Sequence, residues 1–199
     1  ILVCRGARVK PFSLLEEALI IGADTIVVGG RVAGSYLGPG CRIGGEVNHS
    51  IISGYTRKEH EGYLGRCFVG NWVDIGPGTA NTDVKTTFGP IRVAFGPRTL
   101  DTGLSNFGAV IADHVRIGTN QKIPNGAVIG FCARAATGRF LPKFLPSFAW
   151  YSDSGLAAGE PAKLIETVRL AMAASNVDLA GDEAALFHLL PRLVGRFEE

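Results

Sequence analysis

The sequence lacks a marked excess of charge of either sign. Lys and Arg total 20 and Asp and Glu total 18 among its 199 residues, which gives a formal net charge of +2. This basicity is too weak and too scattered to predict binding to nucleic acid, although single basic side chains can still face a phosphorylated small molecule. We therefore expect a small-molecule ligand rather than a polymer.

Long apolar runs and paired cysteines are also missing. No stretch approaches the roughly 18 uninterrupted apolar residues of a membrane span, and the chain does not open with a signal-peptide pattern. The four cysteines form no C-x-x-C pair and lie inside apolar runs, as is typical of buried free thiols: Cys4, Cys41, Cys67 and Cys132. These features predict a cytoplasmic protein without membrane contact.

Glycine, in contrast, is abundant, and aliphatic residues recur with a period of six. The sequence holds 27 glycines, many of them directly after an aliphatic residue. Ile111, Ile117, Ile123 and Ile129 follow one another at this interval without a slip. Shorter runs with the same period are Ile21 with Val27, Leu37 with Ile43, and Val69 with Ile75.

A period of six matches neither the about 3.6 residues of a helical turn nor the alternation of a simple strand. It fits a solenoid in which each hexad forms one short parallel strand and a tight turn, with the aliphatic side chain inside. We expect an all-β solenoid of hexapeptide repeats over residues 1–136. An irregular glycine-rich β-protein is the alternative.

Two interruptions of the period, at about residues 45–63 and 79–110, are the expected places for chemistry, because loops on a rigid scaffold commonly carry it. The first interruption holds "RKEHEGYLG", residues 57–65, which combines two cations, a histidine and a tyrosine. An imidazole titrates near neutral pH, so His60 is a candidate general base. From spacing alone, a lone histidine is more often an ordinary surface or structural residue.

The C-terminal part differs from the repeats. Aromatic residues and prolines in residues 137–158 predict an extended strap over the last coil, and residues 159–199 predict a helical tail. Pro161 suits a helix start, followed by an apolar stripe of Leu164, Ile165, Val168, Ala171 and Met172. Asp182 predicts the cap of a second, shorter helix with an apolar face of Leu186, Leu189, Leu190 and Leu193.

The run "HEGYLGRCFVGNWVDIGPGTANTD", residues 60–83, resembles the acetyltransferase domain of the bacterial bifunctional enzymes that make UDP-N-acetylglucosamine. The similarity includes a five-residue step from Leu64 to Val69 between two six-residue steps. The form "GYTRKEHEGYLG" is closer to a sugar nucleotidyltransferase-like branch. The resemblance implies a left-handed parallel β-helix, a homotrimer, and acetyl-CoA as co-substrate with a sugar phosphate or amino sugar as acceptor.

The resemblance also implies roles for individual residues. His60 matches the family's base, and Tyr63 matches a tyrosine of the sugar-phosphate site. Further substrate-binding candidates are Arg31, Arg57, Lys58, Asp74, Asn81, Asp83 and Lys85. Candidates for binding acetyl-CoA are Gly76, Thr119 and Gly130, with Arg134, Arg139 and Lys143 for its phosphates.

The sequence departs from the family at several of these places. Asp74 stands where the family has Asn, Pro77 stands where it has Ala and removes a backbone donor, and no Lys or Arg occurs between Glu46 and Thr56. No glycine-rich nucleotide-binding segment precedes the repeats. The alternative function is therefore a non-catalytic β-helix that trimerises or regulates a nucleotidyltransferase. The zinc carbonic anhydrases that share the fold need a third histidine beside His60 and His114, so we expect no metal.

Overall fold

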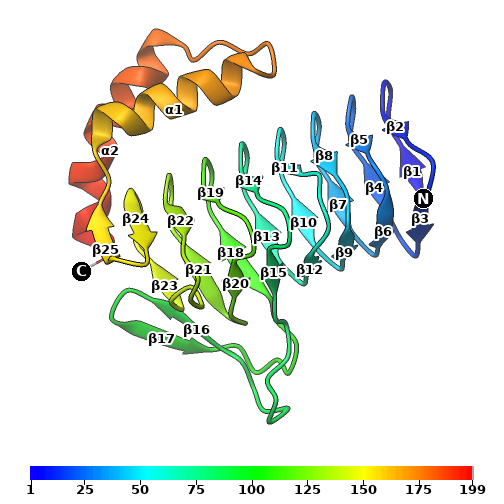
Figure 1. Cartoon of the computed structure of the whole chain (residues 1–199), viewed down its shortest axis with the longest axis horizontal. Coiled ribbons are helices and arrows are strands. Elements are labelled where there is room, and N and C mark those ends of the chain that lie inside the picture. Colours follow the sequence, from blue (N-terminus) through cyan, green and yellow to red (C-terminus); the bar gives the residue numbers. More distant parts are fainter. Residues whose placement is uncertain (199) are drawn as a thin grey trace.

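The computed structural model describes the backbone of residues 1–198, and their side chains except those of residues 161, 191–193 and 195–198. The chain winds into a solenoid of short parallel strands, which ends at two helices (Figure 1). Equivalent strands of successive coils pair with each other. The left-handed parallel β-helix expected from the sequence is confirmed.

Each coil contributes strands to three walls. The first wall contains β1 (Leu2–Val3), β4 (Ile20–Ile21), β7 (Tyr36–Leu37), β10 (Ile51–Ile52), β13 (Phe68–Val69), β18 (Ala109–Ile111), β21 (Ala127–Ile129) and β23 (Phe144–Leu145). The second wall contains β2 (Arg8–Val9), β5 (Ile26–Val27), β8 (Arg42–Ile43), β11 (Arg57–Lys58), β14 (Asp74–Ile75), β19 (Arg116–Ile117), β22 (Arg134–Ala136) and β24 (Ala149–Ser152). The third wall contains β3 (Ser13–Glu16), β6 (Gly30–Ala33), β9 (Glu46–Asn48) and β12 (Tyr63–Gly65), followed by the separate pair β15 (Ala80–Asn81) and β20 (Lys122–Ile123).

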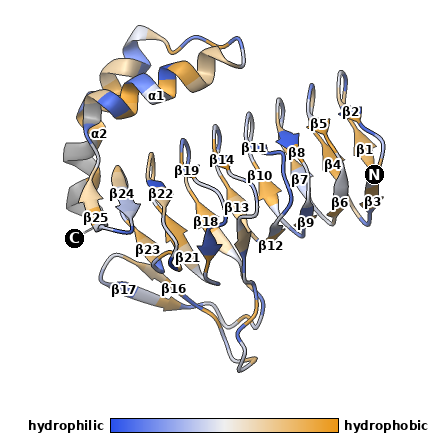
Figure 2. Cartoon of the chain, in the orientation of Figure 1, coloured by the Kyte–Doolittle hydropathy of each residue, from blue (hydrophilic) through white to orange (hydrophobic). Residues whose placement is uncertain are grey.

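The core of the solenoid is the column of side chains that point inward from the walls. Leu37, Ile52 and Val69 of the first wall are fully buried, and so are Val27 and Ile43 of the second. Hydrophobic colour is accordingly concentrated on strands of the walls (Figure 2). The period of six follows from this arrangement, since each coil supplies one inward aliphatic residue per wall. Cys41, Cys67 and Cys132 are buried free thiols, as predicted, whereas Cys4 is partly exposed.

The interruption of the period at residues 45–63 does not interrupt the solenoid. Strands β9 to β12 continue all three walls through this region. The equivalent first-wall residues Tyr36, Ile51 and Phe68 pair directly although they are 15 and 17 residues apart. A short coil is thus followed by a long one, which breaks the period in the sequence but not the stacking of the strands.

The predicted interruption at residues 79–110 is confirmed. Strands β16 (Arg92–Phe95) and β17 (Arg98–Asp101) form an antiparallel hairpin that leaves the solenoid between β15 and β18 (Figure 1). The hairpin folds back toward the C-terminal coils, where the rings of Phe95 and Phe144 lie 5.8 Å apart.

Residues 137–158, expected to form an extended strap, contain β23 and β24, which continue the first and second walls. Leu145 and Ala149 are buried there, four residues apart, so they repeat the aliphatic and small positions of the hexads. Strand β25 (Gly155–Ala158) then pairs antiparallel with β24. The segment therefore adds a partial coil and a hairpin to the end of the solenoid.

Two helices follow. Helix α1 (Pro161–Ala173) begins at Pro161 as predicted and buries Leu164, Ile165, Val168 and Met172. Helix α2 (Gly181–Glu198) has 18 residues against 13 in α1, so the prediction of a shorter second helix is wrong.

The predicted apolar face of α2 is also wrong in part. Leu186 and Leu189 are exposed by 56% and 53%, and Phe187 is buried instead, because the face that packs on α1 contains Phe187 and Leu190. Leu193 lies outside the residues whose side chains are described. Asp182 lies within the first turn rather than at the cap. Within residues 1–198, neither helix is long and apolar enough to cross a membrane.

Candidate functional site

The polar outer face of the third wall brings together several of the predicted substrate-binding residues. Arg31, Glu46 and Tyr63 occupy equivalent outward positions on β6, β9 and β12, because these three residues pair in register. Arg31 forms ion pairs with Glu16 at 2.6 Å and with Glu46 at 3.3 Å. Its guanidinium is therefore already neutralised by carboxylates in this structure.

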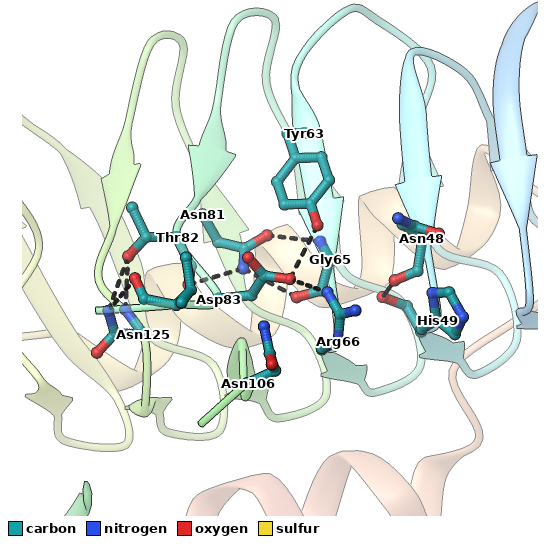
Figure 3. Close-up of polar contacts among 12 residues, drawn as sticks. Asn48, His49, Tyr63, Gly65, Arg66, Asn81, Thr82, Asp83, Asn106 and Asn125 are labelled. Atoms are coloured by element: carbon teal, nitrogen blue, oxygen red, sulfur yellow. Dashed lines mark hydrogen bonds and ion pairs between the residues drawn. The ribbon is translucent and has the colours of Figure 1, made fainter. Parts of the chain in front are cut away.

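Tyr63 belongs to a polar cluster with Asp83 and Arg66 (Figure 3). The Tyr63 hydroxyl donates a hydrogen bond of 2.9 Å to Asp83 Oδ2, and Arg66 forms an ion pair with the same oxygen. Burial, and then the bond to Asp83, raise the pKa of Tyr63 to about 12. The hydroxyl therefore stays protonated at neutral pH and acts as a donor.

Gly65 makes room for the Tyr63 ring. A Cβ atom added at Gly65 would lie 2.1 Å from the Tyr63 hydroxyl oxygen, so any other residue would push the ring away. Asn48 is the register neighbour of Gly65 on β9. Its Oδ1 atom is buried and has no hydrogen-bond partner among the described residues, and so it is available to a donor from a ligand.

His60 lies in the turn between β11 and β12, directly before the third-wall strand that carries Tyr63. Its side chain is exposed and makes no hydrogen bond within the described part of the chain. The backbone carbonyl of His60 is fixed from inside the solenoid, where it accepts a hydrogen bond of 2.7 Å from Lys58 Nζ. The assignment of His60 as base stays a prediction.

Lys58 points into the solenoid, which contradicts its predicted contact with the substrate. It is 1% exposed and occupies the inward position of β11, in register with Ile43. Its ammonium donates to the carbonyl oxygens of Gly44 at 3.0 Å and His60 at 2.7 Å. Burial lowers the pKa of Lys58 to about 8. The strand alternation places it inside, because Arg57 takes the outward position.

Asn81 is also buried, at 4% exposure, which contradicts a direct role in binding substrate. Its amide accepts a hydrogen bond from the Gly65 N–H at 2.7 Å and donates to the Gly65 carbonyl at 2.9 Å. The side chain thus replaces backbone pairing between β12 and β15 at the place where the third wall changes sheet. Its role is structural.

Lys85 and Lys143 lie close together at the base of the β16–β17 hairpin. Lys85 contacts the Pro90 carbonyl, and Lys143 contacts the backbone carbonyl of Asn125. Burial, and then repulsion from Lys85, lower the pKa of Lys143. The sequence assigned these two lysines to different ligands, whereas the structure places them in one basic cluster.

Arg57 and Asp74 lie on the second wall, away from the Tyr63 cluster. Together with Arg116 they line a cavity of about 370 Å³ beneath α1. Arg116 is partly buried, and its buried Nη2 atom has no hydrogen-bond partner among the described residues. Arg116 is not among the residues predicted from the sequence; its position after the buried Val115 marks it as outward, but only the pairing of β14 with β19 places it beside Asp74.

The residues predicted to bind acetyl-CoA are divided between different corners of the solenoid. Gly76 and Thr119 lie on adjacent coils at one corner, where a Cβ added at Gly76 would be 2.6 Å from the Gly118 carbonyl carbon. Gly130 lies at another corner, against Ser147. Arg134 bonds to Lys163 and Thr167 of α1, and Arg139 is exposed. Only Gly76 and Thr119 are therefore gathered at one place.

Two further residues of the Tyr63 cluster were missed from the sequence. Arg66 and Asn48 lie beside Tyr63; Arg66 belongs to the run of residues 60–83 but received no role from the sequence, and Asn48 lies outside that run. The pairing of β9 with β12 brings Asn48 near, and this register is set by coil length. No group of three or more His, Cys, Asp or Glu side chains suited to a metal occurs in the part of the chain that the structure describes.

Comparison with known proteins gives relatives for most of the repeats. A bifunctional protein GlmU of Azoarcus sp. (strain BH72) is 29% identical over 144 residues, which is 71% of this chain and 28% of that protein. The chain therefore resembles GlmU-type bifunctional proteins. A bifunctional sugar-1-phosphate nucleotidylyltransferase/acetyltransferase of Sulfurisphaera tokodaii is 27% identical over 133 residues, 67% of this chain and 28% of that one. The resemblance stated from the sequence is confirmed, and the chain spans less than a third of the length of these GlmU-type relatives.

Solved structures of acetyltransferases match the chain with TM-scores below 0.5. The polySia-specific acetyltransferase NeuO has a TM-score of 0.48 and 15% identity, covering 86% of this chain and 95% of its own. The acetyltransferase domain of PglB from Neisseria gonorrhoeae has a TM-score of 0.47 and 14% identity, covering 75% and 56%. At these scores the similarity supports no inference about function. No protein-family model matches the chain.

Proposed function

We propose that the chain is an acetyl-CoA-dependent acetyltransferase that modifies an amino or hydroxyl group of a sugar phosphate or related amino sugar. The observation that carries the proposal is the similarity to GlmU-type bifunctional proteins and to a protein named as a bifunctional sugar-1-phosphate nucleotidylyltransferase/acetyltransferase. The exposed His60 beside the third-wall cluster supplies a group of suitable chemistry.

The proposed reaction is a direct attack on the thioester. The acceptor nitrogen or oxygen forms a bond to the acetyl carbonyl carbon, the bond from that carbon to the CoA sulfur breaks, and His60 takes the proton of the nucleophile. Tyr63 orients the acceptor through its neutral hydroxyl, and the free Asn48 Oδ1 accepts a hydrogen bond from it. Gly76 and Thr119 would line the path of acetyl-CoA along their corner.

The assembly proposed with this function is a homotrimer, in which neighbouring solenoids complete the acetyl-CoA groove. The outward residues of the first wall support it, because they form an apolar stripe along the solenoid. The residues of the stripe with substantial exposure are Leu2, Ile20, Tyr36, Ile51 and Phe68.

One observation favours the alternative, a non-catalytic trimerising or regulatory module. Lys58 and Asn81 are buried in the solenoid, and Asp83 is engaged by Tyr63 and Arg66. Residues assigned to the substrate are thus occupied by the fold itself.

Release of CoA thiol with acetyl-CoA and glucosamine-1-phosphate tests the proposal. His60→Ala should lower kcat by roughly 100-fold or more, the usual scale for loss of a general base, with nearly unchanged affinity for acetyl-CoA. His188→Ala, which changes an exposed histidine on α2, is the matched control and should leave kcat unchanged. Undiminished transfer by His60→Ala would remove the base assignment. A wild-type protein that binds neither compound would favour the non-catalytic trimerising or regulatory module.

A further inference from the structure

The cavity beneath α1 has the features of a separate binding site. We call it the α1 pocket; it holds about 370 Å³ between the second wall and α1. Its floor consists of Arg57, Asp74 and Arg116, and its roof includes Thr167, Leu170 and Ser175. The volume lies within the range typical of small-molecule sites, about 300–1,000 Å³.

The floor presents an excess of positive charge. Arg57, Asp74 and Arg116 are register partners on three adjacent strands, so they lie side by side on the outer face of the second wall. Two guanidinium groups thus flank one carboxylate. None of the described ion pairs joins Asp74 to either arginine, and the floor therefore keeps a charge of about +1 that no contact neutralises.

Arg116 is the group that most needs a partner. Its Nη2 atom is buried without a hydrogen bond among the described residues. A buried donor left unpaired costs about 1–3 kcal/mol, and more for a charged group. Burial lowers the pKa of Arg116, which agrees with a guanidinium that is short of compensating charge. An anionic oxygen in the pocket would supply both the hydrogen bond and the charge.

The rest of the pocket is built on rigid elements. Helix α1 is held over the second wall by Leu164, Val168 and Met172, which pack against Cys132, Phe148 and Phe187. The rings of Tyr55 and Trp72 stack at 4.1 Å, and both residues line the pocket. Arg57 makes long contacts with the end of α1, at 3.4 Å to the Ala174 carbonyl and 3.5 Å to Ser175 Oγ. The lining therefore combines guanidinium groups with aromatic and aliphatic side chains.

We propose that the α1 pocket binds a small organic anion, a carboxylate or a phosphate monoester, whose charged end pairs with Arg116 and Arg57 and whose apolar part lies against Leu170 and Trp72. Arginine favours both anions, because its planar fork matches two oxygens at once. The site is separate from the Tyr63 cluster, so the proposal does not depend on acetyl transfer.

Calorimetric titration of the full chain with phenyl phosphate and with benzoate tests the proposal, with benzyl alcohol as the uncharged probe. We expect binding of at least one anion and none of the alcohol. Arg116→Gln should weaken binding about tenfold or more, the scale of a lost charge-assisted hydrogen bond. Arg8→Gln removes the same charge from an exposed position on the same wall and should leave the affinity unchanged. Asp74→Asn should strengthen binding, because it removes the only carboxylate of the floor.

Two further variants keep the result interpretable. Leu170→Glu places a carboxylate at an exposed position of the pocket, so it should weaken anion binding several-fold while the helix stays folded. His60→Ala should have no effect, whatever happens to acetyl transfer. The proposal is overturned if neither anion binds at millimolar concentration, if Arg8→Gln and Arg116→Gln weaken binding equally, or if Leu170→Glu binds as tightly as the wild type.

Discussion

At the scale of residues, polar side chains replace aliphatic ones at two inward positions of the solenoid. Lys58 is in register with Ile43, and Asn81 is in register with Ile123. Each is tolerated because it hydrogen-bonds to backbone groups, Lys58 to Gly44 and His60 and Asn81 to Gly65. Both lie next to the turn and strand that carry His60 and Tyr63. We infer that they fix the backbone of the candidate site from within.

Lys58 should make stability depend on alkaline pH. Its pKa is about 8 in the folded state against 10.5 for the free side chain. Below pH 8 Lys58 is protonated in both the folded and the unfolded state, and the cost of burying its charge is fully present. Between about pH 8 and 10.5 the unfolded state binds more protons than the folded state, so stability rises with pH. At about 1.4 kcal/mol per pKa unit, the gain is on the order of 3 kcal/mol. In denaturant unfolding, the difference in the free energy of unfolding between wild type and Lys58→Met should shift by this amount in favour of the wild type over that pH range, and parallel pH curves for the two proteins would contradict it.

Gly65 should control the position of Tyr63. Gly65→Ala places a Cβ where the Tyr63 hydroxyl now lies, so the ring must move and lose its bond to Asp83. Because that bond and burial keep the pKa of Tyr63 near 12, spectroscopic titration of the phenol should show a lower pKa in Gly65→Ala. Gly89→Ala, at an open position, serves as the control. An unchanged titration would show that the ring is placed by other contacts.

At the scale of elements, helix α1 is held in place by the packing of its apolar stripe. Val168 is 3% exposed among aromatic and aliphatic neighbours, whereas Leu170, two residues later, is 61% exposed. The helix runs back along the solenoid from its C-terminal end (Figure 1). Near its start, Lys163 and Thr167 accept hydrogen bonds from Arg134 of β22. At its end, the Ala174 carbonyl accepts one from Arg57 of β11. It therefore ties several coils together.

This difference in burial gives a matched pair of substitutions. Val168→Asp buries an unpaired carboxylate and should lower the free energy of unfolding by about 3 kcal/mol. Leu170→Asp should change it by less than about 0.5 kcal/mol, as is usual for an exposed position. Thermal unfolding measures both. Equal effects of the two substitutions would mean that α1 does not pack as described.

At the scale of the whole molecule, the first wall leaves an apolar stripe exposed. Ile51 and Phe68 are register partners on β10 and β13 and are 52% and 47% exposed. A stripe that continues over several coils is typical of a surface that pairs with another protein. It supports the proposed homotrimer, since cyclic symmetry buries the same wall in every subunit.

Charge on this stripe should therefore dissociate the assembly. Ile51→Glu combined with Phe68→Glu should convert a trimer into a monomer of about 21 kDa in light scattering. Leu100→Glu, which changes an exposed residue of the β16–β17 hairpin, should leave the mass unchanged. A wild-type protein that is already monomeric at micromolar concentration would remove the trimer and the groove between subunits.

The sequence by itself determined the β-solenoid, the interruption of the repeats after residue 79 and the start of α1. These follow from local rules: the six-residue period places one aliphatic side chain per wall, and Pro161 favours a helix start. The sequence also marked His60 and Tyr63 through their motif.

Only the tertiary structure decided which of the other polar residues face outward and what they contact. Lys58 points inward, in register with Ile43, and bonds to the backbone of Gly44 and His60. Arg116 met Arg57 and Asp74 because strands distant in sequence pair side by side. Such neighbours depend on coil length and on where a helix packs, which no local pattern records.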